Sequence, residues 1–488
     1  MIKLIRHTPL ILILALGLLV RTYRLDRPLG DWHSWRQADT ASVTRYYAQH
    51  GLDLLHPKFD DLSAIPSGFD NPEGYRMVEF PIINALIAGS YRFTPALQSF
   101  PIHVASRFFA IAFSLLTSLV LYRLVAKLEG QTAGLIATTI FTFLPFNIFF
   151  STTTLPEVPL VFFTLASIYF WVVYAQKPTL LPLGAFAASA ALALLLKPTY
   201  LFIAPALVYF YFLHHGFKTF KLPRHYLVAA LTLAPFLLWR RWIAAYPEGI
   251  PSYAWLLNGS HIRFTGAFFR WLFAERLAKW ILGYWGPVLF ILGLLTKTSK
   301  KTGWFFHVWL LGMLAYLVVF ATGNVTHDYY QIFLLPIVAV FAALGTKSLL
   351  NLPSTHFNRL VSWALAPVLL AFSFAFSWFH VRDYFNINNP AMVAAGAYVD
   401  AHLPQDALVV APYLGDTAFL YQTNRRGWPV AGDIPKRIDQ GADYYITTAM
   451  NDETKALVRQ CRLIHETDQF ALIDLAACDF TISPTTAQ

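Results

Sequence analysis

The chain has 488 residues, of which 56% are apolar and only 13% are charged. A water-soluble chain of this length carries about twice that share of charged residues, so the composition excludes an ordinary soluble protein. The net charge of +10 does not indicate nucleic-acid binding, because the basic residues are dispersed between apolar runs and form no basic stripe. The two cysteines, Cys461 and Cys478, are too few for a disulfide scaffold along the chain.

Eleven apolar stretches are candidates for membrane-spanning helices, because a helix rising about 1.5 Å per residue must cross about 30 Å of hydrocarbon. They are residues 8–23, 102–126, 132–149, 155–174, 179–196, 200–213, 226–243, 280–295, 304–321, 329–344 and 360–379. The first resembles a signal peptide, but Arg21, Tyr23 and Arg24 follow it where small residues would precede cleavage, so we expect an uncleaved span. The stretch 81–93 is too short to span and is expected at the membrane interface or under the preceding loop.

The cations of the short loops predict the orientation, because Lys and Arg in short loops stay on the cytoplasmic side. With the N-terminus inside, these loops carry one acid, Glu129, and many cations. The cations are Lys3, Arg6, Arg123, Lys127, Lys177, Lys218, Lys221, Arg224, Lys297, Lys300, Lys301, Lys347 and Arg359. We therefore expect three outward-facing regions, namely a first loop, 24–101, a second loop, 244–279, and the C-terminal tail.

The tail differs from the rest of the chain, because its apolar fraction falls and strand-like and helix-like segments alternate. The predicted strands are 407–410, 444–448 and 470–475, and the predicted helices are 391–402 and 452–460. We therefore divide the chain into a membrane domain, 1–380, and a small extracytoplasmic α/β domain, 381–488. Cys461 and Cys478 both lie in this domain, where either a disulfide between them or two buried free thiols is compatible with the sequence.

Unusual polar residues gather on the predicted outer side. In the first loop they include Asp31, His33, Arg36, Asp39, Asp60, Asp61, Asp70, Glu73 and Glu79. At the outer ends of spans they are Glu157, Lys197, Arg240, Arg241, His327 and Asp328. Ionisable groups at membrane depth are costly and tend to mark functional sites. The pattern predicts a reaction at the outer membrane surface, with acids for proton transfer and cations for an anionic leaving group.

Several short segments on this face recur in a recognisable order. They are Asp39 to Arg45, Glu79-Phe80-Pro81-Ile82, Ala105-Ser106-Arg107, Leu155 to Leu160, Leu195-Leu196-Lys197-Pro198, His327 to Gln331 and Leu334-Leu335-Pro336. This succession, within roughly residues 8 to 345, resembles the integral-membrane GT-C glycosyltransferases of family 39. That branch includes protein O-mannosyltransferases and the aminoarabinose lipid A transferase. The resemblance implies an α-helical polytopic membrane protein that transfers a sugar at the outer face from a polyprenyl-phosphate-sugar donor.

The resemblance also implies a first-loop carboxylate near the reacting centre, where a base must take the proton of the acceptor hydroxyl. Asp39 is the first candidate. Asp31 is the second, because the family usually shows adjacent Asp and Glu where this chain has Asp39-Thr40. Asp39 could instead cap a helix that begins at Thr40. Glu79 could position the acceptor or hold a cation, or it could be an ordinary interfacial acid.

Candidates for binding the donor phosphate are the cations Arg107, Lys197, Arg240 and Arg241. A guanidinium inside the end of a span requires a partner, so Arg107 is expected to face a phosphate or a carboxylate, with Glu157 as the structural alternative. The adjacent Arg240 and Arg241 could equally be anchors at the membrane interface.

Further substrate contacts are expected from polar and aromatic residues at the outer ends of two spans. These are Glu157, His327, Asp328, Tyr329 and Tyr330. No cofactor follows from the sequence, although a divalent cation could be held by oxygen and imidazole ligands. The possible ligands are Asp31, His33, Asp39, Glu79 and His327, whose spacing fixes no coordination geometry.

Two other functions are compatible with many spans and polar outer loops. A transporter or flippase of lipid-linked saccharides should carry inverted repeats and polar residues inside broken helices, and neither is evident in the sequence. A polymerase or ligase of lipid-linked oligosaccharides would share the outer acids. The sugar and the acceptor are not indicated by the sequence, and the expected partners are the lipid-linked donor and membrane lipids, without nucleic acid.

Overall fold

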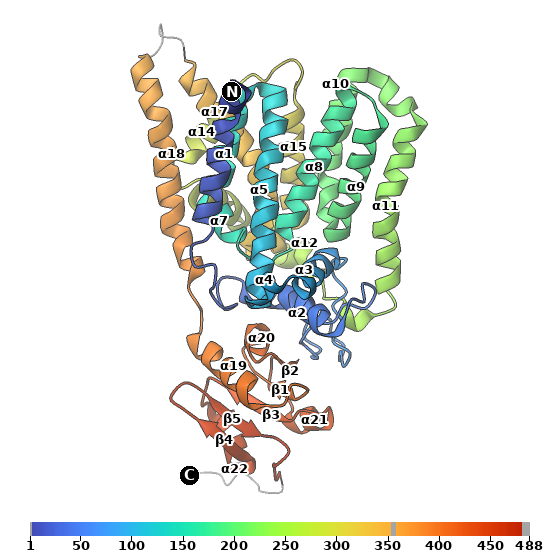
Figure 1. The fold of residues 1–488 in the computed structure, drawn as a ribbon, viewed down its shortest axis with the longest axis vertical. Coiled ribbons are helices and arrows are strands. Elements are labelled where there is room, and N and C mark those ends of the chain that lie inside the picture. Colours follow the sequence, from blue (N-terminus) through green and yellow to red (C-terminus); the bar gives the residue numbers. More distant parts are fainter. Residues whose placement is uncertain (1, 353–357, 481–488) are drawn as a thin grey trace. The chain divides into compact units, whose positions relative to one another are not determined.

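The computed structural model describes residues 2–352 and 358–480, with side chains from residue 8 onward. The chain forms two compact units (Figure 1). The helical unit comprises Met1–Leu25, Arg107–Arg241 and Tyr253–Asp383, and the loop–tail unit comprises Asp26–Ser106, Trp242–Ser252 and Tyr384–Gln488. The first loop thus groups with the tail, whereas the sequence-based division assigned it to residues 1–380. The side chains of Lys3 and Arg6, predicted to be cytoplasmic, lie outside the described residues.

The helical unit consists of helices joined by short connections. Its α-helices are α1 (Ile2–Val20), α5 (Ile102–Glu129), α6 (Gln131–Phe143), α7 (Pro145–Phe150), α8 (Glu157–Gln176), α9 (Leu180–Leu196), α10 (Ala204–His215), α11 (Pro223–Ile243), α12 (Trp255–Asn258), α13 (Gly266–Phe269), α14 (Gly286–Leu295), α15 (Phe305–Val319), α16 (Ala321–Thr326), α17 (Leu335–Leu350) and α18 (Arg359–Val381). Tighter or wider turns form η1 (Pro198–Ile203), η2 (Gly216–Lys221), η4 (Gly259–Phe264), η5 (Arg270–Ile281) and η6 (Asp328–Leu334).

Five helical runs of the described residues are long and apolar enough to cross a membrane, or six if the bent pair η5 and α14 forms one span. Shorter apolar helices cover Thr8–Val20, Leu180–Leu196 and Phe305–Val319. A polytopic helical membrane protein is therefore confirmed, while the count of eleven spans and the outward position of the tail stay predictions.

The predicted eighth span, 280–295, is wrong as a single helix. Helix η5 ends at Ile281, α14 begins at Gly286, and the two axes differ by 112°. The cause is local, because Gly283 and Tyr284 adopt φ values of 54° and 61°, which end a right-handed helix. Pro287 then starts the new helix. Average hydropathy alone does not detect such a break.

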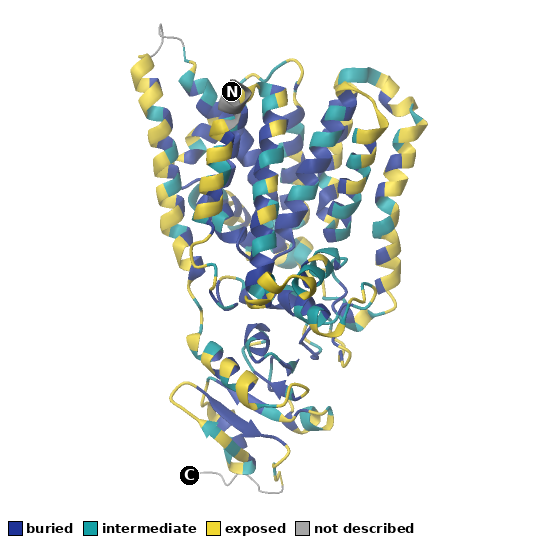
Figure 2. Cartoon of the chain, in the orientation of Figure 1, coloured by how far each residue is buried: buried dark blue, intermediate teal, exposed yellow. Residues whose placement is uncertain are grey.

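Two glycines allow α14 and α17 to pack closely in the interior of the helical unit. A Cβ atom on Gly293 would collide with the carbonyl oxygen of Phe341, and one on Gly345 would collide with that of Leu289. Within a membrane, helices associate through such close backbone contact, because lipid is as apolar as leucine. Most residues of α17 are accordingly buried (Figure 2).

Replacing Gly345 by Val is expected to separate these helices and destabilise the helical unit. Overpacking of this kind costs about 1–3 kcal/mol. Thermal unfolding of the purified protein in detergent should show a lower midpoint for Gly345→Val than for Gly184→Val, since nothing lies within 4 Å of a Cβ placed at Gly184. Equal midpoints for the two variants would contradict the proposed role of close packing.

The loop–tail unit contains a five-stranded sheet of order β2-β1-β3-β5-β4. The strands are β1 (Leu408–Val410), β2 (Arg426–Trp428), β3 (Tyr444–Thr447), β4 (Arg462–Glu466) and β5 (Ala471–Asp474). Strand β1 pairs in parallel with β2 and β3, whereas β5 pairs antiparallel with β3 and β4. The predicted strands correspond to β1, β3 and β5. The short β2 and the polar, alternately exposed β4 were missed.

The unit's helices are α2 (Ser34–His50), α3 (Ile82–Phe93), α4 (Pro95–Gln98), α19 (Pro390–His402), α20 (Ala418–Gln422), α21 (Ile434–Asp439) and α22 (Asp452–Gln460), with 3₁₀ turns η3 (Pro247–Gly249) and η7 (Arg382–Phe385) next to them. One apolar core joins the two sequence regions, because Ala38 and Ala41 of α2 pack with Val409 and Phe419 of the tail. A Cys461–Cys478 disulfide is present, so the first of the two alternatives is correct.

Candidate functional site

The first-loop helix α2 holds Asp39 in a buried set of hydrogen bonds. Its Oδ1 accepts from the hydroxyl of Thr417 at 2.7 Å, and its Oδ2 lies 2.8 Å from a guanidinium nitrogen of Arg76. The helix begins at Ser34, five residues before Asp39, so the alternative that Asp39 is an N-cap is wrong. Asp39 therefore projects from the middle of a helix, held from the first loop on one side and from the tail on the other.

Three other carboxylates, the buried Asp60 and Asp61 and the half-buried Asp416, interact electrostatically with Asp39. Burial raises the pKa of Asp61 to about 7, and the negative charge of Asp39 adds to the rise, against hydrogen bonds from Ser63. Burial likewise raises the pKa of Asp60 and of Asp416 to about 6, and Asp39 contributes to both shifts. The pKa values of Asp60, Asp61 and Asp416 are thus raised from the ordinary range of an Asp carboxyl toward neutral pH.

The raised pKa of Asp61 predicts a pH dependence of stability. Between its ordinary value of 3.8 and about 7, the folded chain keeps a proton that the unfolded chain has released, so the free energy of unfolding falls as the pH rises through this range. Asp61→Asn keeps the acceptor for the Ser63 amide, 2.7 Å away, but has no charge. We expect this variant to be more stable than wild type at pH 8, on the order of a few kcal/mol. In thermal unfolding scans, the difference in stability between Asp61→Asn and wild type should be smaller at pH 5 than at pH 8. An equal difference at both pH values would contradict the raised pKa of Asp61.

The other two first-loop candidates also lie in ion pairs. Asp31 is completely buried and pairs with Arg27, while the amide of Gln37 donates to its Oδ1 at 2.6 Å. Glu79 pairs with Arg36. The side chain of Glu79 is 14% exposed, against 5% for Asp39 and 0% for Asp31. Access to an acceptor is therefore greatest at Glu79, and Asp31 is placed to fix the start of α2.

A second polar cluster lies in the helical unit, where Lys197 pairs with the buried Glu157. The Lys197 ammonium also lies 4.9 Å from the ring centre of Tyr330 and 5.7 Å from that of Tyr329. The Oε2 atom of Glu157 is buried and has no hydrogen-bond partner among the described residues. Buried polar atoms of this kind are normally satisfied, so this oxygen can accept a bond from a bound group.

The neighbouring segment brings His327 and Asp328 into the same unit. A guanidinium nitrogen of Arg276 lies 4.0 Å from the buried Asp328 carboxylate, and the Arg276 guanidinium stacks 4.1 Å from the ring centre of Trp280. His327 stacks on Tyr329 at 5.4 Å. Sequence reasoning missed Arg276, because it occurs within the second loop and is remote in sequence from Asp328.

The remaining predicted cations differ in environment. Arg107 is fully buried and donates to the carbonyl oxygen of Leu25 at 2.8 Å. Glu157, the structural alternative for Arg107, pairs with Lys197, and a contact of Arg107 with a phosphate or a carboxylate stays a prediction. Arg240 and Arg241 are exposed in the last turn of α11. Exposed Arg side chains at a helix end are typical of interface anchors.

The sequence left open whether a divalent cation is bound. Among the residues that the structure describes, no three His, Cys, Asp or Glu side chains are placed to hold a metal ion. In the loop–tail unit, Asp31, Asp39 and Glu79 each face a different arginine, namely Arg27, Arg76 and Arg36. Each of these three carboxylates is therefore already paired with a cationic side chain.

Sequence reasoning also missed the partners of Asp39. Arg76 and Thr417 are remote in sequence from α2, and Asp416 accepts from the Ser34 hydroxyl at 2.9 Å. A signal for the tail residues existed, because Asp416 and Thr417 follow β1, whose neighbours β2 and β3 lie on opposite sides. Functional residues of parallel sheets concentrate at the carboxyl ends of such strands.

The comparisons with known proteins agree with this architecture. The dolichyl-phosphate-mannose-protein mannosyltransferase family matches residues 82–242. No curated protein sequence matches the chain. ArnT from Cupriavidus metallidurans bound to undecaprenyl phosphate has a similar structure, with a TM-score of 0.68 and 13% identity over 96% of this chain and 98% of that chain.

A second likeness is to the Archaeoglobus fulgidus oligosaccharyltransferase in the apo form, with a TM-score of 0.58 and 11% identity over 90% of this chain and 69% of that chain. The archaeal oligosaccharyltransferase AglB from Archaeoglobus fulgidus, in complex with an inhibitory peptide and a dolichol-phosphate, gives a TM-score of 0.54 at 11% identity, over 90% of this chain and 69% of that chain. At these identities the likeness establishes the fold. Together with the family match, it confirms the resemblance of this chain to the membrane glycosyltransferases of the GT-C superfamily.

Proposed function

We propose that the protein transfers a sugar from a polyprenyl-phosphate-sugar donor to an acceptor at the outer face of the membrane. The observation that carries the proposal is the likeness of almost the whole chain, 96%, to a transferase fold that was solved with undecaprenyl phosphate. The archaeal likeness, solved with a dolichol-phosphate, points to the same class of lipid. A lipid-linked donor reaches the enzyme along the bilayer, so no nucleotide-binding Gly-rich loop is required, and none occurs in the sequence.

In this proposal a first-loop carboxylate is the general base. Asp39 takes the proton of the acceptor hydroxyl as the oxygen attacks the anomeric carbon. The new carbon–oxygen bond forms while the bond to phosphate breaks, and its electron pair leaves with the polyprenyl phosphate. Direct displacement of this kind inverts the anomeric configuration. Glu79, the most exposed of the candidate acids, positions the acceptor.

The leaving phosphate requires fixed positive charge. We assign this role to Lys197, whose ammonium is oriented by Glu157 and Tyr330. The free Oε2 of Glu157 is available to a sugar hydroxyl. Arg107 and the pair Arg240-Arg241 remain candidates for the same phosphate.

Residues at and next to the start of η6 complete the proposed donor site. The half-buried His327, stacked on the buried Tyr329, offers a ring that suits the apolar face of a sugar. The carboxylate of Asp328 faces the guanidinium of Arg276, so we assign Asp328 the role of positioning the neighbouring donor-site residues. The proposed reaction does not use a divalent cation, because Asp31, Asp39 and Glu79 each pair with an arginine.

The experiment that tests the proposal measures release of polyprenyl phosphate from a panel of synthetic polyprenyl-phosphate-sugars by the purified protein in detergent. Crude membrane extract supplies the acceptor, and parallel reactions contain a chelator. Turnover of one donor, lost in Asp39→Asn and retained in Asp31→Asn, is the expected result. If no donor in the panel released polyprenyl phosphate in the presence of the extract, the proposal would be contradicted.

A further inference from the structure

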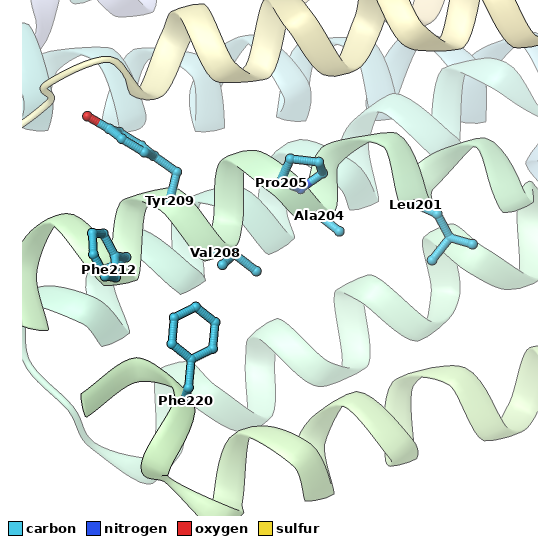
Figure 3. A pocket seen from close by; sticks show the side chains of 7 residues that line it. All are labelled: Leu201, Ala204, Pro205, Val208, Tyr209, Phe212 and Phe220. Carbon is cyan, nitrogen blue, oxygen red and sulfur yellow. The ribbon is translucent and has the colours of Figure 1, made fainter. Parts of the chain in front are cut away.

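An open apolar groove follows α10 on the surface of the helical unit. It has a volume of about 740 Å³ and is lined by Leu201, Ala204, Pro205, Val208, Tyr209, Phe212 and Phe220 (Figure 3). Tyr209 is the one polar lining residue, and its hydroxyl already accepts a hydrogen bond from the Trp304 amide at 2.9 Å. The groove therefore presents hydrocarbon-like walls and needs an apolar occupant.

Helix α11 does not fill the groove, although it follows α10 in the chain. Most residues of α11 are exposed along its length, among them Leu227, Leu231 and Leu238 (Figure 2). In lipid there is no hydrophobic force that drives one apolar helix onto another. None of the residues that line the groove belongs to α11.

The length of the groove matches one leaflet of a bilayer. From Leu201 in η1 to Phe212 in α10 the chain advances about 18 Å, at about 2.0 Å per residue in the 3₁₀ turn and about 1.5 Å per residue in the α-helix. This is about half of the roughly 30 Å hydrocarbon thickness. A phospholipid acyl chain spans one leaflet, whereas a long polyprenyl chain would extend beyond the groove.

One end of the groove carries the markers of the membrane interface. The rings of Phe217 and Phe220 contact that of Phe212 at centre distances of 5.3 and 6.3 Å. Phe217 is 75% exposed and Tyr226 is 61% exposed. Exposed aromatic residues at the end of a span mark the headgroup level.

The same end is strongly basic. Lys218, Lys221 and Arg224 are all exposed there. No acidic residue occurs between Glu157 and Glu248, so nothing nearby in the sequence neutralises them. Each Lys or Arg near an anionic lipid surface contributes about 1 kcal/mol of binding free energy.

From the apolar groove, its one-leaflet length and the three cations at its end, we propose that the protein binds an anionic phospholipid here. One acyl chain lies along α10 between Leu201 and Phe212, and the phosphate lies at Lys218, Lys221 and Arg224. The lipid occupies the space between α10 and α11 and ties the exposed α11 to the rest of the helical unit. This site is independent of the proposed sugar transfer.

Native mass spectrometry of the purified protein, with added phosphatidylglycerol or phosphatidylcholine of identical acyl chains, tests the proposal. The wild-type protein should bind phosphatidylglycerol at least about tenfold more tightly than phosphatidylcholine. The triple variant Lys218→Gln, Lys221→Gln, Arg224→Gln should lose this preference. The matched control replaces Lys297, Lys300 and Lys301 by Gln, which removes the same charge from another loop and should keep the preference.

A second variant, Ala204→Trp, keeps every cation and fills the groove, so it should weaken binding of both phospholipids. If the triple variant does not fold, Ala204→Trp still tests whether phospholipids bind in the groove. Retained preference in the triple variant, or equal loss in the control, would overturn the proposal. Displacement of bound phosphatidylglycerol by equimolar undecaprenyl phosphate would overturn the choice of occupant.

Discussion

Asp39→Asn is expected to lower kcat for sugar transfer by about 10²- to 10⁴-fold, the usual contribution of a general base. The amide keeps an acceptor for the Thr417 hydroxyl, which lies 2.7 Å from Oδ1, but it cannot take a proton. Steady-state kinetics with the donor identified in the panel measure the effect. KM for the acceptor should change little, because the substitution removes proton transfer rather than binding.

The controls for this prediction come from the same cluster of acids. Asp61→Asn makes the same chemical change at a buried neighbour without a proposed catalytic role, and it should keep kcat within a few fold. Glu79→Gln should raise KM for the acceptor more than it lowers kcat. If Asp39→Asn retained kcat and Glu79→Gln lost it, the base would be Glu79.

The second large effect is expected at Lys197. Lys197→Gln removes the proposed charge for the leaving phosphate and should lower kcat about 10²- to 10³-fold. It also leaves Glu157 buried without its cation, which costs about 3–5 kcal/mol of stability. Kinetics and thermal unfolding should therefore both change.

The double variant Lys197→Gln, Glu157→Gln separates the two effects. Without the unpaired carboxylate, its unfolding midpoint should return toward that of wild type, while transfer stays slow. Recovery of both stability and rate would show that Lys197 acts only as the structural partner of Glu157.

Elements with local signals were predictable from the sequence. Helix α19 begins at Pro390 after Asn389, whose side chain accepts from the Ala391 amide, and α22 begins after the similar cap Asn451. Such caps act within one turn and are therefore readable in the sequence. The expected helices 391–402 and 452–460 accordingly match the structure within a residue.

The broken helices were not predictable from hydropathy. Leu144 and Pro145 divide the expected span 132–149 into α6 and α7, and positive φ values at Gly283 and Tyr284 end η5. A sliding average of hydropathy carries no information about φ. The local cue was proline, which disfavours a helical conformation in the residue before it.

The candidate residues were predictable by type and the site's contacts were not. Burial of Asp39, Glu157 and Asp328 agrees with the expectation that acids in this setting are functional or paired. The hydrogen bond of Asp39 to Thr417, however, joins residues 378 positions apart. No pattern of local spacing encodes such a pairing, because the core shared by α2 and the tail creates it.

The most direct test of the central claim uses proteoliposomes that contain the protein and a polyprenyl-phosphate-sugar labelled in the sugar, with membrane extract as acceptor. The account predicts that the label leaves the polyprenyl lipid and becomes covalently attached to an acceptor, with inverted anomeric configuration, and that Asp39→Asn prevents this. Label that crosses the bilayer while still attached to its lipid would contradict the account and identify a transporter.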